Sequence, residues 1–196
     1  MAILDRKLRL AGAGLVAVVA AIVVPVLVLG ARTERRLGEG KPAPELSGKA
    51  VRGRVVDLKR LRGHIVLVSF VNFRAQLSGN GDLSLSQSTF LRSMESQHAR
   101  FGLRTIIVDA TRAGGGAVLS RTDVLNWTYN WNLAPPIAVL PDEEGTFARR
   151  FAVTKTPTTF LIDQDGVVNR RWDGFVPVAS LDFAIRALEG RSPGSS

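Results

Sequence analysis

The side chains best suited to nucleophilic or redox catalysis are nearly absent from this sequence. Its 196 residues include no cysteine and two histidines, His64 and His98. Without cysteine the chain can form neither a disulfide nor a thiolate metal site, and it has no thiol nucleophile. A serine hydrolase needs a base within reach of its nucleophile. We expect both histidines to be structural, because His64 begins a strand pattern and His98 shares an apolar helix face.

Catalytic motifs of other kinds are also missing. There is no Gly-x-Ser-x-Gly elbow and no P-loop, and Gly79-x-Gly81 is too short a fragment to indicate phosphate binding. Asp163 and Asp165 resemble part of a calcium loop, but its later ligands are absent and turn chemistry explains both residues. We therefore expect no cofactor and no metal. The net charge of +9 comes without a nucleic-acid motif, so we expect no nucleic acid partner.

Two groups of side chains could bind a partner without catalysis. Trp127 and Trp131 share a helix face while Tyr129 points elsewhere, and we expect core packing here rather than a ligand platform. A basic stretch could touch anionic lipid or form a solvated edge, and we expect the edge. Its members are Lys49, Arg52, Arg54, Lys59, Arg60 and Arg62.

An uncharged apolar segment runs from Leu10 to Ala31. As a helix it would be about 33 Å long, enough to cross a hydrocarbon core of roughly 30 Å. We predict an uncleaved transmembrane signal-anchor at 10–31, after a short N-terminal tail at 1–9. A cleaved signal peptide is the alternative, although its apolar core is normally shorter, about 7–15 residues.

Basic residues on both sides of this segment leave its orientation open. Arg6, Lys7 and Arg9 precede the segment, and Arg32, Arg35, Arg36 and Lys41 follow it. A long following domain can translocate whatever its charge. We expect a single-pass protein of the cell membrane, with its soluble domain extracytoplasmic.

The rest of the chain divides into a linker, one domain and a tail. Residues 32–45 are rich in glycine, proline and charge, which predicts a linker. Residues 46–190 are numerous enough to bury a full core, and 191–196 (RSPGSS) predict a disordered tail.

Three apolar runs of strand length lie within this domain, at His64–Val71, Leu103–Val108 and Thr158–Ile162. Continuous rather than alternating hydrophobicity indicates strands covered on both faces, as in the middle of an α/β sheet. The turn at 163–166 (DQDG) leads into 167–172, which predicts a hairpin.

Helical patterns separate these strands. Apolar spacing predicts a helix over about 85–100, and Ser120 with Asp123 predicts a capping box at the start of another. Acidic residues at 142–144 and arginines at 149–150 predict a short helix between them. A last helix carries Leu181, Ile185 and Leu188 inward. Strands alternating with helices predict an α/β sandwich with a mixed central sheet.

The order of these elements and several short motifs resemble the thioredoxin-like superfamily, in particular the membrane-anchored TlpA/ResA-type (AhpC/TSA-like) redoxins. The likeness spans about 40–188. The segments that carry it are 40–44 (GKPAP), 56–63 (VDLKRLRG), 64–70 (HIVLVSF) and 156–163 (TPTTFLID) with Asp165-Gly166. The resemblance implies a thioredoxin-like sandwich with helices on both faces of the sheet.

In that family the strand matching 64–71 runs into a Trp-Cys-x-x-Cys motif at a helix N-terminus, where the helix end lowers the pKa of the attacking thiol. Here Ala75 and Ser78 fall near the cysteine positions, in a longer loop whose register is open. The degenerate motif comprises Arg74, Ala75, Gln76, Leu77 and Ser78. Alanine has no nucleophile and serine forms no disulfide, so this chain alone cannot exchange disulfides.

Pro157, preceded by Thr156, matches the family's cis-proline, which lies beside the redox motif and exposes backbone to bound peptide. The resemblance therefore predicts a cis bond and a candidate peptide-binding surface, although the proline could also serve loop shape alone. We expect a membrane-tethered module that binds a polypeptide. A redoxin acting with a thiol partner in trans and a purely structural membrane-complex subunit are the alternatives.

Overall fold

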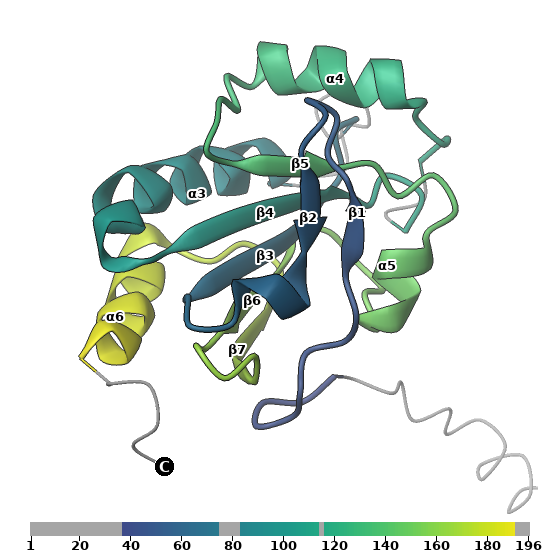
Figure 1. Cartoon of the computed structure of the whole chain (residues 1–196). Coiled ribbons are helices and arrows are strands. Elements are labelled where there is room, and N and C mark those ends of the chain that lie inside the picture. Colours follow the sequence, from purple (N-terminus) through teal and green to yellow (C-terminus); the bar gives the residue numbers. More distant parts are fainter. Residues whose placement is uncertain (1–36, 75–82, 114–115, 191–196) are drawn as a thin grey trace, which may run out of the picture. The chain divides into compact units, whose positions relative to one another are not determined.

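A mixed β-sheet organises the part of the chain that the computed structural model describes, residues 37–74, 83–113 and 116–190 (Figure 1). These residues form a five-stranded sheet in the order β5-β4-β3-β6-β7. The strands are β3 (Val66–Val71), β4 (Arg104–Asp109), β5 (Ala138–Leu140), β6 (Thr158–Ile162) and β7 (Val168–Asp173). Central β3 pairs in parallel with β4 and antiparallel with β6, and all six of its residues are buried.

Helices cover both faces of this sheet. The helices are α3 (Ser84–His98), α4 (Arg121–Asn130), α5 (Thr146–Arg150) and α6 (Val178–Glu189), with the 3₁₀ helices η1 (Leu58–Leu61) and η2 (Ala99–Phe101). One core joins one sheet face to buried residues of α3, α4 and α6. The other core joins the opposite face to α5 and to the hairpin of β1 (Ser47–Lys49) and β2 (Val55–Asp57). The predicted mixed α/β sandwich is therefore confirmed.

The N-terminal part of the described chain lies along the outer strand β7. Gly40 donates its N–H to the carbonyl oxygen of Val168 at 2.8 Å, and Val168 donates to the carbonyl oxygen of Lys41 at 2.9 Å. Pro42 forms an isolated antiparallel bridge with Val167. These contacts fix where the chain joins the sheet.

Within the described residues, no helix has the length and apolar character needed to cross a membrane. The predicted transmembrane segment at 10–31, the tail at 1–9, the first part of the linker at 32–45 and the tail at 191–196 all lie outside the described residues. The transmembrane segment therefore stays a prediction.

The predicted helix at 142–150 is shorter than expected, since α5 begins at Thr146. Asp142 lies before the helix, and its carboxylate accepts hydrogen bonds from the N–H groups of Phe147 at 3.0 Å and Ala148 at 2.9 Å. The first backbone N–H groups of any helix lack acceptors within the helix. The carboxylate of Asp142 supplies these acceptors from a position before the helix.

The tryptophan pair packs in the core, as expected. Trp131 is 5% exposed, and its ring centroid lies 4.7 Å from that of Phe73 and 6.0 Å from that of Trp127. Tyr129 points outward, and the guanidinium of Arg52 lies 4.7 Å from its ring centroid. Trp127 of α4 and Trp131 directly after the helix therefore anchor α4 to the core rather than form a ligand platform.

Several side chains of the basic stretch have local partners. Arg54 donates to the carbonyl oxygen of Pro136 at 3.0 Å, and Lys59 donates to Glu45 at 3.2 Å. Arg60 lies 3.7 Å from the carboxylate of Asp57. These contacts fit the expected solvated edge.

Candidate functional site

The candidate site lies where β3 ends, at Asn72, Phe73 and Arg74. The next described residue is Leu83, and α3 begins at Ser84. Ala75, Gln76, Leu77 and Ser78, the rest of the degenerate motif, lie outside the described residues. The described part of the site therefore comprises the residues that flank the 75–82 segment and the strands beside them.

A side-chain contact joins the two ends of that segment. The N–H of Asn72 donates to Oγ of Ser84 at 2.8 Å, and Oδ1 of Asn72 accepts from the N–H of Arg74 at 2.9 Å. Asn72 is 2% exposed and Ser84 is fully buried. The end of β3 and the start of α3 are thus held together by hydrogen bonds that no sequence pattern indicated.

A second network fixes Phe73 to the end of β4. The N–H of Phe73 donates to Oγ1 of Thr111 at 3.1 Å, and this hydroxyl donates to Oδ1 of Asp109 at 2.5 Å. The N–H of Thr111 also donates to Oδ1 of Asp109, at 3.1 Å. The chain leaving β3 is therefore positioned by a buried acid that acts through a threonine.

Burial raises the pKa of Asp109 from 3.8 to about 6. Hydrogen bonds from Thr111 oppose this rise, and the neighbouring charge of Asp142 adds to it. Desolvation disfavours the charged carboxylate, while the hydroxyl and amide donors favour it. Asp109 thus changes charge close to physiological pH, directly behind the backbone of the candidate site.

The Thr156–Pro157 peptide bond is cis, which confirms the prediction. The register Phe70↔Thr158 places Pro157 one position beyond the pairing of β6 with β3, at the end of β3 that leads to Asn72. The N–H of Gly174 donates to the carbonyl oxygen of Pro157 at 2.7 Å. Another cis bond, Pro135–Pro136, was not predicted.

A buried hydroxyl pair lies between β3 and β6 near this end, at the third residue of β3 from its end and the second residue of β6. Oγ of Ser69 and Oγ1 of Thr159 are 2.9 Å apart, and both residues are fully buried. Because each hydroxyl is the hydrogen-bond partner of the other, the pair is satisfied inside the sheet. It gives the site polar support and no free nucleophile.

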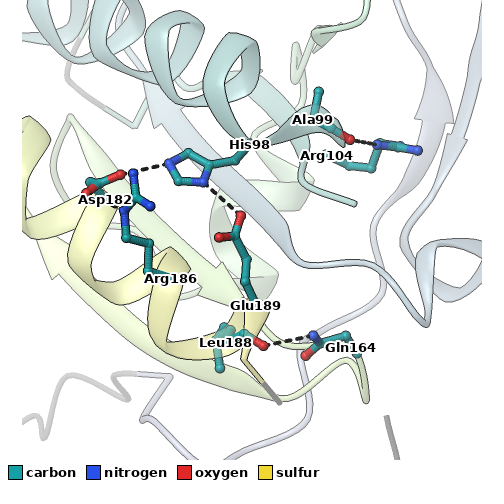
Figure 2. A network of polar contacts seen from close by, with 8 residues as sticks. All are labelled: His98, Ala99, Arg104, Gln164, Asp182, Arg186, Leu188 and Glu189. Carbon is teal, nitrogen blue, oxygen red and sulfur yellow. Dashed lines mark hydrogen bonds and ion pairs between the residues drawn. The ribbon is translucent and has the colours of Figure 1, made fainter. Parts of the chain in front are cut away.

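Both histidines lie away from these residues. His98 is the last residue of α3, at the opposite end of the helix from Ser84, where it contacts Asp182 and Glu189 of α6 (Figure 2). His64 precedes β3, at the end of the strand far from Asn72. A base–nucleophile pair with histidine is therefore not assembled at the described part of the site.

Among residues 37–74, 83–113 and 116–190, no group of three or more acidic or histidine side chains is placed to hold a metal ion. The described polar groups at the site are bonded to one another or to backbone, as in the contacts of Asn72, Asp109 and Thr111. Their arrangement suits the holding of a fixed backbone surface, rather than bond making at a reactive atom.

Comparisons with known proteins agree with this architecture. The chain is 26% identical over 137 residues to thiol-disulfide oxidoreductase ResA of Bacillus thuringiensis, covering 69% of each chain. The same identity and coverage hold for ResA of Bacillus cereus. No family model matches the sequence.

Solved structures also resemble this one. A putative thiol:disulfide interchange protein DsbE from Chlorobium tepidum superposes with a TM-score of 0.64 at 23% identity, covering 79% of this chain and 99% of that one. A putative thioredoxin from Neisseria meningitidis gives 0.64 at 19% identity, covering 79% and 94%.

The protein therefore has the thioredoxin-like fold, and its relatives include thiol-disulfide oxidoreductases of the ResA type. Since the chain contains no cysteine, it lacks the Cys-x-x-Cys motif on which disulfide exchange depends.

Proposed function

We propose that this protein is a membrane-tethered, extracytoplasmic thioredoxin-like module that binds a polypeptide without thiol chemistry. The tether is the apolar segment 10–31, and the binding surface is formed by Pro157, Thr156 and the segment 74–82. The single observation that carries the proposal is that the cis-Pro157 loop remains beside the end of β3 in a chain with no cysteine.

The supporting structure around this surface argues for a retained use. Asn72 is bonded to Ser84, and Phe73 is bonded through Thr111 to Asp109, so both sides of the 75–82 segment are fixed. Preorganised backbone lowers the entropy lost when a peptide binds. These bonds would hold the residues on both sides of the 75–82 segment in place when a peptide binds.

Site-specific photo-cross-linking in membranes tests the binding surface. A photoreactive residue replaces Thr156 in the full chain, and a matched control carries it at Val55, which is 67% exposed on β2. We expect one discrete adduct from position 156 that is absent from position 55. The adducted protein is then purified and its affinity for wild-type chain measured. Equal adducts at both positions, or no measurable affinity, contradict the proposal.

The absence of thiol chemistry and the topology are tested separately. The purified full chain should not accelerate insulin reduction by dithiothreitol, and acceleration would favour a redoxin that acts with a thiol in trans.

The extracytoplasmic placement has its own test. Protease added to intact spheroplasts should digest the domain. Full protection of the domain would rule out the extracytoplasmic placement while leaving the binding surface open to the cross-linking test.

A further inference from the structure

His98 ends α3 with both ring nitrogens against carboxylates of α6. Its Nδ1 lies 2.8 Å from Oε1 of Glu189, and its Nε2 lies 2.9 Å from Oδ1 of Asp182 (Figure 2). The side chain of His98 is 1% exposed, so both of its polar contacts are made inside the protein. The two contacts link the end of α3 to two points on α6, seven positions apart in the sequence.

The chemistry of these partners fixes the number of protons required. A neutral imidazole donates from one ring nitrogen and accepts at the other, whereas an ionised carboxylate only accepts. With both carboxylates ionised, both contacts can be hydrogen bonds only when both ring nitrogens carry protons. Asp182 also accepts from Nε of Arg186 at 2.8 Å, and this bond, more than the contact with His98, lowers the pKa of Asp182.

Other charged groups surround this arrangement. On α6, Arg186 lies between the two carboxylates in the sequence. From η2, Arg100 lines a surface hollow together with His98, Arg186 and Glu189. From β4, Arg104 donates to the carbonyl oxygen of Leu103 at 2.7 Å. The buried imidazole of His98 thus forms part of the lining of this hollow.

The contact between α3 and α6 has a second polar link at its other end. Oε1 of Gln87, in the first turn of α3, accepts from the N–H of Val176 at 2.8 Å, just before α6 begins. Between the two links lie apolar side chains of one core cluster, Leu91 and Met94 on α3 and Leu181, Ile185 and Leu188 on α6. The amide of Gln87 does not titrate, so only the His98 link can respond to pH.

We propose that His98, Asp182 and Glu189 form a proton-dependent clasp, which holds α6 from Asp182 to Glu189 against the end of α3 and loosens it when His98 loses a proton. Loss of the proton removes one hydrogen bond and leaves a lone pair facing a carboxylate. The start of α6, up to Leu181, stays anchored by the link between Gln87 and Val176 and by the buried side chain of Leu181. The clasp is independent of the proposed binding function.

Nuclear magnetic resonance can test the protonation state directly, because the chain has two histidines. In a His64→Gln background of the full chain in detergent micelles, His98 gives the only imidazole signals. We expect the ¹⁵N shifts of both ring nitrogens to be those of an imidazolium at about pH 6. A neutral imidazole at that pH, with α6 still protected from exchange, would overturn the proposal.

Hydrogen exchange then tests whether the end of α6 loosens when His98 loses its proton. Between about pH 6 and about pH 9, protection factors corrected for intrinsic exchange should fall about tenfold for amides of Ile185–Glu189 and little for Val178–Leu181. Glu189→Gln is the matched control, because a glutamine amide can donate to a neutral imidazole while Asp182 accepts from its other nitrogen. In this variant the fall should disappear.

Asp182→Asn replaces the other carboxylate with an amide and should likewise reduce the fall in protection between low and high pH. This second variant keeps the test usable if Glu189→Gln folds poorly. A fall in protection that is spread evenly along α6, or that persists unchanged in both variants, contradicts a clasp at His98.

Discussion

The hydroxyl of Thr111 joins Asp109 to the backbone of the candidate site, donating to Oδ1 of Asp109 at 2.5 Å and accepting from the N–H of Phe73 at 3.1 Å. All three residues are buried, so each bond counts toward stability more than an exposed one would. The position of the chain where it leaves β3 therefore depends on a side chain at the end of β4. Two of the predictions below follow from this link.

Asp109→Asn should remove a pH dependence of stability. The pKa of Asp109 rises from 3.8 to about 6, which corresponds to about 3 kcal/mol. Because the folded protein holds this proton more tightly than the unfolded chain, the free energy of unfolding falls as pH rises from about 4 to about 6. Denaturant titrations at a series of pH values should show a smaller fall in the variant. An unchanged pH profile would show that Asp109 is not the group responsible.

Thr111→Val should destabilise the protein by about 1–3 kcal/mol, because it leaves the buried N–H of Phe73 without its acceptor and removes a donor from Asp109. It should also raise the pKa of Asp109 further, since that hydrogen bond opposes the effect of burial. Urea unfolding measures the first effect and carboxyl ¹³C shifts the second. Thr111→Ser keeps the hydroxyl and is expected to stay much closer to wild type in both measurements.

The pair of Ser69 and Thr159 should show strong coupling. Thr159→Val alone leaves the hydroxyl of Ser69 buried without its partner and should cost about 1–3 kcal/mol. Adding Ser69→Ala removes the stranded hydroxyl, so the double variant should be less destabilised than the sum of the two single variants. Thermal unfolding of all four proteins completes the cycle. Additive effects would mean that the 2.9 Å contact contributes nothing.

Ser120→Ala should weaken the start of α4. Oγ of Ser120 accepts from the N–H of Asp123 at 3.2 Å, and the N–H of Ser120 donates to the carboxylate of Asp123 at 3.2 Å; the two bonds together form a capping box. Loss of such a cap costs about 1 kcal/mol. Urea unfolding should show this loss, and Ser120→Thr, which retains a hydroxyl, should show little of it. Equal losses in the two variants would assign the effect to something other than the cap.

Features encoded locally could be predicted from the sequence. The buried strands β3 and β6 follow from continuous apolar runs, and the capping box of α4 follows from the spacing of Ser120 and Asp123. The cis bond before Pro157 followed from the family resemblance. Strands β1, β2 and β5 were missed because each has three residues, too few to display a hydrophobic period.

Contacts between distant residues could not be predicted in this way. Phe73 and Thr111 are 38 positions apart, and His98 and Glu189 are 91 positions apart. Periodicity describes which face of an element is apolar, but it does not say which polar groups meet once two elements pack. The position of His98 on an apolar helix face predicts a structural role. Its two carboxylate partners could not be predicted, because they depend on how α3 and α6 pack.

The contacts of Gly40, Lys41 and Pro42 with β7 also bear on how the protein behaves at high concentration. An outer strand with free N–H and carbonyl groups is a template for strand addition by another chain. Here the chain's own residues cover the first part of that strand, and Pro42 offers no N–H. Farther along β7, Arg170 carries a charge that is 57% exposed. The β7 edge of the sheet is thus protected against edge-to-edge aggregation, a property that matters for any protein concentrated at a surface.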